Sequence, residues 1–451
     1  MEDDTLRSWV NLAARAAVPL VVMITASGAS HLTADRSSAA QPMASSAGSG
    51  SCDSLATCYS PAQIRVAYGI QPLTDRGIDG RGQTVVLPEI AEQKLSPGVG
   101  AASVTNIRQD LAGFDKLFHL PAPRLQVTTV LAPGASRWLA SGEEALDVEM
   151  IHAVAPAAAI SVLLFNASGV DTPEGFTTAV TELVRFGVAH GDVISLSGAR
   201  GEHCFTSAEV ARMNAALHTA ASSHITFVAS SGDVGPVGSE CPSPSSSFTP
   251  VREVSLPASD PFVLAVGGTS LAASHKAGAY RGEVAWGPPN GGAGAPGTTD
   301  QASGGGFSHL FLRPSYQDGI PGTARGVPDV AADASGHTGM ALAISVGHGQ
   351  IAIGNSGGTS ASAPFWAGII ALADQYAGHS LGFVNPALYA IARGPRYHAA
   401  FHDITKGNNT VEFPPQTFRG YSAAPGWDPV TGLGSPDASV LIPLLARYAC
   451  R

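Results

Sequence analysis

The chain alternates patterns of buried β-strands with patterns of helices over most of its length. Strand patterns occur at residues 84–90, 127–131, 159–165, 192–197, 225–231 and 262–268, and helix patterns at 105–119, 142–154, 173–190 and 207–222. The strands read as continuous apolar runs, which is typical of strands buried on both faces. This alternation predicts βαβ units and a mostly parallel sheet with helices on both faces.

The edges of such a sheet indicate where a functional site can form. In open sheets of this kind, ligands bind beyond the carboxyl ends of the strands. The residues that follow each strand, and the helix starts after them, are therefore the positions of interest. By contrast, residues 281–326 are rich in Gly and Pro and are expected to form a loop.

Ser360 is the first candidate for a functional residue. It lies in the stretch Gly357-Gly358-Thr359-Ser360-Ala361-Ser362-Ala363-Pro364, and the run FWAGIIALADQY that follows has helical periodicity. Glycines permit a tight turn at such a loop-to-helix junction, and the helix N-terminus offers N–H groups that suit a developing oxyanion. The pattern fits a serine nucleophile, and it fits equally well an ordinary N-cap serine.

Composition limits the class of protein. Of the 451 residues, 44% are hydrophobic and only 13% are charged, which favours a large buried core and argues against a disordered chain. The formal net charge is −10 and the pI is about 5.7, so the chain has no basic footprint for nucleic acid.

The N-terminal region favours export. Residues 16–30 form an uncharged, mostly apolar run that is short for a membrane span and fits the core of a signal peptide. We expect a signal peptide or N-terminal anchor at residues 1–32, a flexible linker at 33–51 and one domain at 52–451. A secreted or cell-envelope location follows, with transient membrane contact only through the N-terminal segment.

The five cysteines can form disulfides if the chain is exported. Cys52 can pair with Cys58, and Cys204 with Cys241, which leaves Cys450 over. No C-x-x-C spacing occurs, which argues against a zinc or redox motif.

Two carboxylates at helical spacing are the next candidates. Glu143 and Asp147 are four residues apart, so their side chains lie on one face of the predicted helix. They can form a solvated acidic face, or one carboxylate can orient the other and shift its pKa. Glu144, between them, completes a capping-box pattern with Ser141 and has a structural explanation.

Asp233 and His152 extend the set of candidates. Asp233 follows the strand pattern at 225–231, and it can be a turn residue or, when protonated, a donor to an oxyanion. His152 can be a core histidine or a catalytic base. Because the chain has no His-Gly-x-His pattern, a glutamate is the better candidate for the base of Ser360.

Taken together, these motifs resemble those of the sedolisins, the serine-carboxyl peptidases. The motifs are Glu143-Glu144-Ala145-Leu146-Asp147, then Ser231-Gly232-Asp233, then the stretch around Ser360, and the resemblance covers about residues 52–451. It implies a subtilisin-like α/β fold and proteolysis at acidic pH.

The resemblance implies a role for each residue. Ser360 would be the nucleophile, Glu143 the general base and then the acid, Asp147 the residue that holds Glu143, and Asp233 the oxyanion donor. Glu89 resembles an accessory acid linked to the catalytic pair in some members, and it can equally be a loop carboxylate.

One calcium ion near the C-terminus is also implied. Asp403 and Asp428 would supply carboxylates, and Ile404, Ala424 and Gly426 would supply backbone carbonyls. Ala424 stands where glycine is usual in the family, and the segment can instead be a simple Gly/Pro turn.

Two departures from the family matter. Only residues 1–51 precede the catalytic part, so no large prodomain is apparent. Gly198-Ala199-Arg200 stands where many members have a tryptophan near the substrate, so substrate preference does not carry over.

We expect a monomer that acts on protein or peptide substrates. The alternatives are a subtilisin-type serine hydrolase with His152 as base, and a non-catalytic pseudopeptidase that binds its partners.

Overall fold

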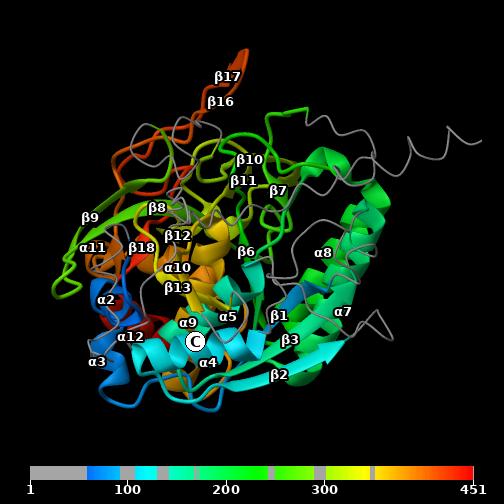
Figure 1. Ribbon diagram of the computed structural model, residues 1–451. Helices are drawn as coiled ribbons and strands as arrows, with labels where there is room; N and C mark the ends of the chain where they lie inside the picture. The colour runs from blue at the N-terminus through cyan, green and yellow to red at the C-terminus, as the bar shows by residue number, and fades with distance from the viewer. Residues whose placement is uncertain are drawn as a thin grey trace, which may run out of the picture.

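The computed structural model describes residues 58–91, 107–129, 142–166, 170, 172–241, 249–288, 301–345 and 351–449 of the chain (Figure 1). The predicted signal or anchor segment at 1–32 and the linker at 33–51 lie outside the described residues, as do Cys52, Ser141 and Cys450. The predictions for those residues therefore stay predictions.

An eight-stranded sheet forms the centre of the structure. Seven strands run in the order β12-β8-β6-β4-β1-β3-β2, each parallel to its neighbours, and β9 is antiparallel to β8. The strands are β1 (Thr84–Ala91), β2 (Arg124–Thr129), β3 (Ala159–Asn166), β4 (Val193–Leu196), β6 (Thr226–Ser230), β8 (Leu264–Ala273), β9 (Tyr280–Ala285) and β12 (Val330–Asp333). The predicted, mostly parallel sheet is confirmed.

Successive residues of each central strand face two different hydrophobic cores. In β1, Val85 and Leu87 belong to one cluster and Val86 to the other. In β3, Val162 belongs to the first of these clusters and Leu163 to the second. Because side chains alternate along a strand, an apolar run without alternation needs cover on both faces.

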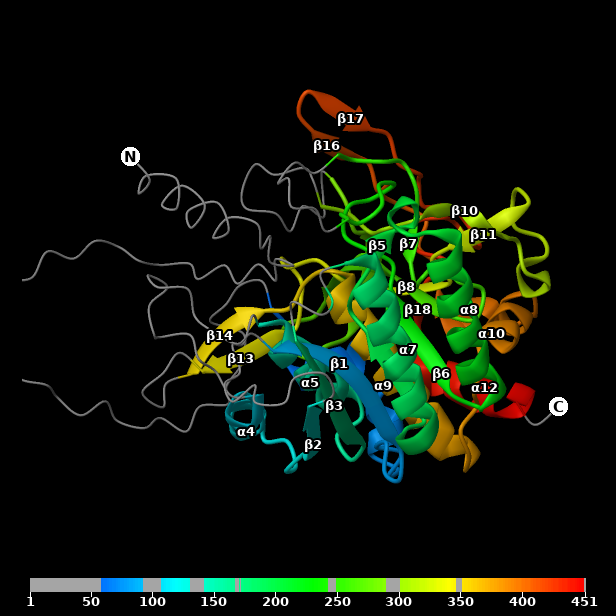
Figure 2. The ribbon, with the colours of Figure 1, turned by 90° about the vertical axis from the view of Figure 1, so that its right-hand side faces the viewer.

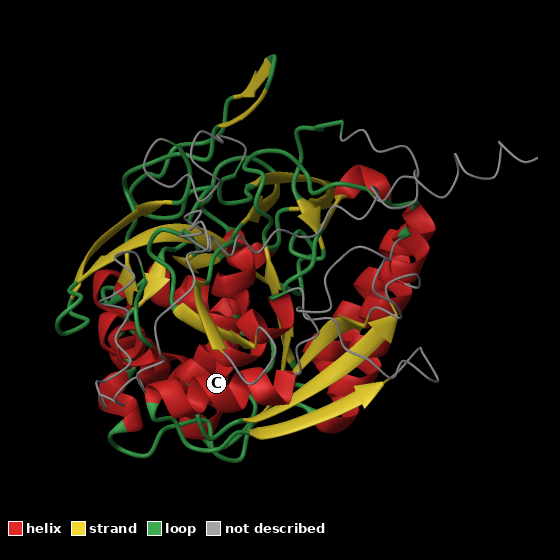
Figure 3. Cartoon of the chain, viewed as in Figure 1, coloured by secondary structure: helices red, strands yellow, loops and turns green. Residues whose placement is uncertain are grey.

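Helices supply that cover (Figures 2 and 3). The main helices are α4 (Ile107–Phe118), α5 (Glu143–Val154), α7 (Pro173–His190), α8 (Ser207–Ser222), α9 (Thr359–Ala377) and α12 (Ala438–Ala449). The core on one face is built with α4, α5, α9 and α12, and the core on the other face with α7 and α8. The residues that follow β4 and β6 contact the first turn of α9.

Two helices that carry site residues are buried all round. In α9, every residue from Thr359 to Asp374 is buried. In α5, the buried set includes Glu144, Asp147, Glu149 and His152, so the two sides of the helix do not differ in burial. A helix enclosed on all sides needs no polar face toward water, which removes the alternative of a solvated acidic face.

One loop prediction was wrong. Residues 281–326 contain most of β9 as well as β10 (Gly306–Leu312) and β11 (Ala324–Val327). β9 pairs with β8, and β10 pairs with β11. Such short strands depend on a partner strand more than on local propensity, so Gly-rich sequence hid them.

Smaller elements complete the described chain. The helices are α2 (Pro61–Ala67), α3 (Gln71–Thr74), α10 (Asn385–Ala392) and α11 (Tyr397–Ala400), with 3-10 turns η4 (Glu202–Cys204) and η5 (Ser315–Gln317). The strands are β5 (Arg200–Gly201), β7 (Ser255–Leu256), β13 (Ala341–Ser345), β14 (Ile351–Asn355), β15 (Phe401–His402), β16 (Val411–Phe413), β17 (Gln416–Phe418) and β18 (Ser435–Pro436). Among the described residues, no helix is both long and apolar enough to cross a membrane.

Candidate active site

Ser360 lies in the first turn of the central helix. The residue that precedes α9 is Gly358, with φ of 75°, and Ser360 is the second residue of the helix. Ser360 is therefore not an N-cap serine, and that alternative is wrong. Its side chain is buried, at 5% exposure of the residue, and its hydroxyl lies 3.4 Å from the carbonyl oxygen of Ser197. A nucleophile at this position also needs a partner that can take its proton.

Glu143 supplies that partner. It is the first residue of α5, after Gly142 with φ of 90°, and both of its carboxyl oxygens are shielded from solvent. Burial raises the pKa of Glu143 well above its usual range, and repulsion from Asp147 raises it further. The nearby Ser360 side chain acts in the opposite direction and lowers this pKa. A carboxyl group in contact with a serine hydroxyl is suited to take its proton.

Asp147 lies one helical turn beyond Glu143 and is 1% exposed. The Ser197 hydroxyl donates a hydrogen bond of 2.8 Å to Asp147 Oδ1. Burial raises the pKa of Asp147 to about 8, with the Ser197 bond acting to lower it and the charge of Glu144 to raise it. The carboxyl is thus neutral over most of the acidic range, and it can hold a proton next to Glu143.

Ser197 links the two halves of the site, and the sequence analysis missed it. It follows β4 directly, and its hydroxyl donates to Asp147 and also lies 3.2 Å from the carbonyl oxygen of Ser360. Its own carbonyl faces the Ser360 hydroxyl. The signal was present, because Ser197 is the first residue after a parallel strand, where ligands are expected.

Asp233 is held against the start of α9. The backbone N–H of Thr359 donates to Asp233 Oδ1 at 2.7 Å, and the Thr359 hydroxyl donates to the same oxygen at 2.8 Å. The N–H of Gly232 in turn donates to that hydroxyl at 3.1 Å. Burial raises the pKa of Asp233, and the two bonds from Thr359 oppose this. Thr359 is a second residue that the sequence analysis missed.

Gly358 explains the close approach of Asp233. A Cβ atom at position 358 would lie 2.6 Å from Asp233 Oδ2, and the φ of 75° is itself unfavourable for other residues. Gly358 therefore leaves room for the carboxyl group of Asp233. Asp233 Oδ2 lies beside the backbone that leads to Ser360.

Glu89 belongs to the same group of acids. It lies within β1, opposite Leu164 of β3, and is 4% exposed, so the alternative of a loop carboxylate is wrong. Burial raises its pKa well above the usual range, followed by repulsion from Asp147, Glu144 and Glu143. Because the charge of each of these carboxyls changes the pKa of the others, Glu89 and the carboxylates of α5 titrate as one interacting group.

His152 is occupied elsewhere. Its Nε2 lies 3.0 Å from the carbonyl oxygen of Pro121 and 3.0 Å from Asp115 Oδ1. It stands nine residues after Glu143, about 13 Å farther along α5 at the usual rise per residue. The hydrogen bond and the ion pair of this histidine therefore direct its Nε2 toward α4 and the segment that follows that helix.

The proposed calcium ligands come together near the C-terminus. The N–H of Gly426 donates to both oxygens of Asp403, at 3.0 and 3.2 Å. Asp428 accepts from the N–H groups of Val430 and Ala424, and burial raises its pKa to about 6.

The backbone carbonyls of this segment fit a metal shell. Within the described part of the chain, no hydrogen bond is made to the carbonyl oxygens of Ile404, Ala424 or Gly426. Two carboxylates and three carbonyls without a protein donor are the mixed oxygen set that calcium prefers.

The comparisons with known proteins cover the region of the chain that holds these residues. Residues 135–386 match the model of the subtilase family, and this range contains Glu143, Asp147, Asp233 and Ser360. The chain is 34% identical over 409 residues to kumamolisin of Bacillus sp. (strain MN-32), covering 87% of the chain and 64% of that relative. It is 34% identical over 304 residues to sedolisin of Pseudomonas sp. (strain 101), covering 66% of the chain and 48% of that relative.

A solved structure is similar to this chain over most of its length. Pseudomonas sedolisin, described as a serine-carboxyl proteinase complexed with pseudo-iodotyrostatin, superposes with a TM-score of 0.67 at 28% identity. The match covers 87% of this chain and 98% of that chain. The chain therefore belongs to the subtilase family, in its sedolisin group, and has the subtilisin-like fold. It spans about half to two thirds of the length of the curated relatives named here.

Proposed function

We propose that this chain is a serine-carboxyl peptidase that hydrolyses peptide bonds of proteins or peptides at acidic pH. The observation that carries the proposal is the position of the Ser360 hydroxyl, close enough to Glu143 to lower the pKa of its carboxyl, within a group of buried acids that includes Glu89 and Asp147. A serine with a carboxylate base, and with a second acid at the oxyanion position, is the arrangement that such a reaction requires.

The first step transfers the Ser360 proton to Glu143. Ser360 Oγ attacks the carbonyl carbon of the scissile bond as Glu143 takes the hydroxyl proton. The carbonyl oxygen becomes an oxyanion, which a protonated Asp233 stabilises by donating a hydrogen bond. Thr359 holds Asp233 Oδ1 through two bonds, which leaves Oδ2 as the oxygen that carries the proton.

The second step completes the cycle. Glu143 gives its proton to the leaving amine, and the C–N bond breaks to form an acyl-enzyme on Ser360. Water then attacks the ester, Glu143 takes a proton from that water, and collapse returns the proton to Ser360. Asp147, protonated near neutrality and below, holds Glu143 in place throughout.

Two protonation states must coexist. Glu143 has to be ionised when it acts as base, and Asp233 has to be protonated when it acts as donor. Both groups are carboxyls, and each has a pKa raised by burial. Because these groups repel one another, the cluster holds its remaining protons as the first one leaves. A state with one ionised and one protonated carboxyl therefore extends over a range of pH, and the proposed reaction uses the form in which Glu143 is the ionised one.

We also propose one calcium ion held by Asp403, Asp428 and the carbonyls of Ile404, Ala424 and Gly426. The ion would supply charge neutralisation for two carboxylates and would tie residue 403 to the 424–428 turn. Its role would be structural, because no catalytic step of the proposed reaction passes through these residues.

An exported monomer is the setting we propose. Cys204 and Cys241 form a disulfide with a Cα–Cα distance of 5.5 Å, and disulfides persist in oxidising compartments. This supports a secreted or cell-envelope location, in line with the predicted signal or anchor at residues 1–32.

The central test uses two serines on one helix. Hydrolysis of an internally quenched peptide is measured between about pH 3 and about pH 7 for Ser360→Ala and for Ser362→Ala. Ser362 is buried in the same turn, where its hydroxyl lies 3.1 Å from the carbonyl oxygen of Ala332. We expect hydrolysis at acidic pH by the unmodified chain and by Ser362→Ala, and none by Ser360→Ala. Hydrolysis that survives Ser360→Ala would overturn the assignment of the nucleophile.

A second measurement separates the peptidase from a non-catalytic binding protein. A peptide aldehyde should form a hemiacetal with Ser360 Oγ at acidic pH, detected as a raised melting temperature that Ser360→Ala lacks. If the unmodified chain neither hydrolyses peptides nor responds to the aldehyde, the pseudopeptidase alternative holds.

A further inference from the structure

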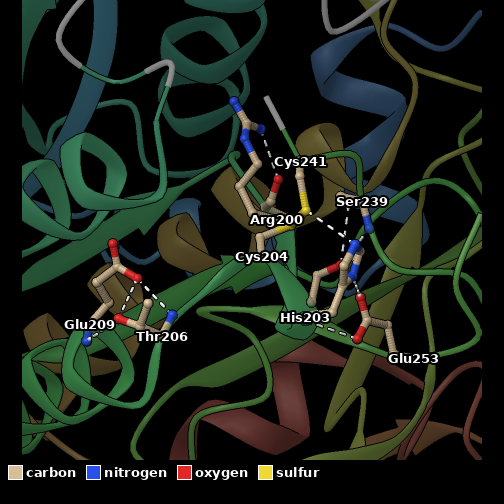
Figure 4. The surroundings of a disulfide bond; sticks show 10 residues. Arg200, His203, Cys204, Thr206, Glu209, Ser239, Cys241 and Glu253 are labelled. Carbon is tan, nitrogen blue, oxygen red and sulfur yellow. Dashed lines mark hydrogen bonds and ion pairs between the residues drawn. A yellow bond between two sulfur atoms is a disulfide. The ribbon is translucent and has the colours of Figure 1, made fainter. Parts of the chain in front are cut away.

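A second group of reactive side chains lies around the disulfide, outside the proposed active site (Figure 4). It consists of His203, Cys204, Cys241 and Glu253. The Nε2 atom of His203 lies 3.2 Å from the Cys241 sulfur, and one ligand atom from each of His203, Cys204 and Cys241 lies within 4.8 Å of the others. No catalytic step of the proposed peptidase uses these residues.

Glu253 fixes the orientation of this histidine. One carboxyl oxygen contacts His203 Nδ1, and the other accepts a bond of 3.0 Å from the His203 backbone N–H. Figure 4 shows the imidazole ring between the carboxylate and the sulfur atoms. With a proton on Nδ1 shared with Glu253, the lone pair of Nε2 faces the two sulfurs.

The carboxylate itself is held rigidly. Its side chain is 3% exposed, and a Cβ atom at Gly201 or Gly238 would lie 2.3 or 2.5 Å from Glu253 Oε1. The His203 side chain, in contrast, is 43% exposed, so the outer side of the ring is open to solvent. A buried carboxylate that orients an accessible imidazole is the usual support behind a zinc-bound histidine.

We propose that reduction of the Cys204–Cys241 disulfide converts this cluster into a zinc site. The ligands would be the two thiolates and His203 Nε2, with the fourth position open to water, as in sites with three protein ligands. No C-x-x-C spacing is needed, since the ligands come from η4 and from Cys241, which the fold brings together. A C-x-x-C motif supplies ligands that are close in the chain, whereas Cys204 and Cys241 are 37 residues apart.

The chemistry balances with a named reductant. A phosphine attacks one sulfur, the S–S bond breaks, and water supplies the phosphine-oxide oxygen and the protons of two thiols. Zinc then displaces both thiol protons, which pass to the buffer. The ligand sulfurs must separate to about 3.8 Å for Zn–S bonds of about 2.3 Å in tetrahedral geometry. This is a small movement for two residues whose Cα atoms already lie 5.5 Å apart.

Zinc would replace the disulfide as a cross-link between the same two segments. The Gly201 N–H donates to the carbonyl oxygen of Ser239 at 2.7 Å, and the Ser239 N–H donates to the Ser255 hydroxyl at 2.9 Å. The segment that leads to Cys241 is therefore anchored close by in either state. The proposal does not depend on the proposed peptidase activity.

The experiment measures zinc binding directly. The full chain carrying Ser360→Ala is reduced with a phosphine at about pH 7.5, where thiols begin to ionise, and zinc is titrated with a chromogenic chelator as competitor. We expect one zinc ion per chain after reduction and none before it. In the Cys204→Ser/Cys241→Ser variant the stoichiometric binding should vanish, whereas Cys58→Ser, at the other described cysteine, should leave it unchanged.

Two further variants distinguish a built site from two thiols that happen to bind zinc. His203→Gln removes a ligand, and Glu253→Gln removes the supporting carboxylate, which should weaken zinc about 10- to 100-fold. Circular dichroism of the unreduced variants checks that each is folded. Equal zinc affinity in reduced His203→Gln and the reduced parent chain would overturn the proposal, as would absence of zinc binding by the reduced parent.

Discussion

The hydroxyl of Ser197 donates a hydrogen bond of 2.8 Å to Oδ1 of Asp147. This bond joins the end of β4 to the middle of α5, and it favours the ionised form of a carboxyl whose pKa burial raises to about 8. Ser197 touches no substrate atom in the proposed reaction. It is therefore a positioning residue, which sets where Asp147 lies and how strongly Asp147 holds its proton.

Removing this hydroxyl should change both rate and pH profile. In Ser197→Ala we expect kcat/KM to fall about tenfold, the usual effect of one lost hydrogen bond. The acid limb of the profile should move to higher pH, because the Glu143–Asp147 pair then releases its first proton at a higher pH. Ser197→Thr keeps a hydroxyl, so the acid limb of its pH profile should lie where it does in the unmodified chain.

The matched control for that prediction lies in β4, two residues before Ser197. Ser195 is buried, and its hydroxyl has no hydrogen-bond partner among the described residues. Ser195→Ala should leave the limb in place. If both alanine variants shift the profile alike, the effect is one of packing and the positioning role of Ser197 is wrong.

The proposed role of Asp233 as a hydrogen-bond donor predicts that activity is lost at alkaline pH. Its carboxyl donates to the oxyanion only while protonated, so activity is present at low pH and is lost as pH rises through a pKa that burial has raised. In Asp233→Asn, the amide oxygen can accept both Thr359 bonds while the amide N–H donates at any pH. We expect the alkaline limb to move to higher pH in this variant.

The matched variant at this position is Asp233→Ala. Without any donor, kcat should fall about 100- to 1,000-fold, as for the loss of one oxyanion donor. Steady-state rates across the pH range check both outcomes. An alkaline limb that is the same in Asp233→Asn and in the unmodified chain would assign that limb to another group.

The buried acids predict that stability falls as pH rises. Asp147 has a folded pKa of about 8 against 3.8 for the ordinary side chain, and Glu89 and Glu143 are raised as well. Between these values the folded chain binds more protons than the unfolded chain, so the free energy of unfolding decreases with pH. Denaturant unfolding of the Ser360→Ala chain at about pH 4 and about pH 8 measures the difference.

Asp147→Asn tests the source of that slope. The amide does not titrate, so the loss of stability between the two pH values should be smaller than in the parent. Glu412→Gln, at an exposed position of β16, should leave the slope unchanged. A stability that rises over this range would contradict the protonated state assigned to the buried carboxyls.

Calcium binding predicts a dependence of melting on free calcium. A ligand that binds only the native state stabilises it by about 2.7 kcal/mol at a free concentration of about 100 times its Kd. Chelation should therefore lower the Tm of the Ser360→Ala chain by several degrees, and added calcium should restore it. The Ser360→Ala background prevents self-digestion during the measurement.

Asp403→Asn gives the specific control for the metal. The amide keeps an oxygen that can accept the Gly426 N–H bond and loses the charge that attracts calcium. Its Tm should respond little to chelator. A parent chain whose melting does not change with chelator would remove the calcium assignment.

Much of the fold was readable from apolar patterns. Strands with apolar residues at successive positions, such as Val85, Val86 and Leu87, are stable only when both faces are covered, so the layered architecture follows from local sequence. The strands within 281–326 were missed, since Gly-rich segments acquire strand structure from a partner such as β8.

The sequence alone also determined the residue types of the site: a serine at a helix start, two carboxylates one turn apart and an aspartate after a strand. Only the tertiary structure decided how deeply these residues are buried and how their pKa values are shifted. It buried α5 on all sides, turned a possible acidic surface into a cluster with raised pKa values, and placed Glu89 beside it. It also brought Ser197 and Thr359 into the site and placed Cys241 and Glu253 beside His203. Burial and contact between residues far apart in the chain are properties of the packed chain, and no local spacing contains them.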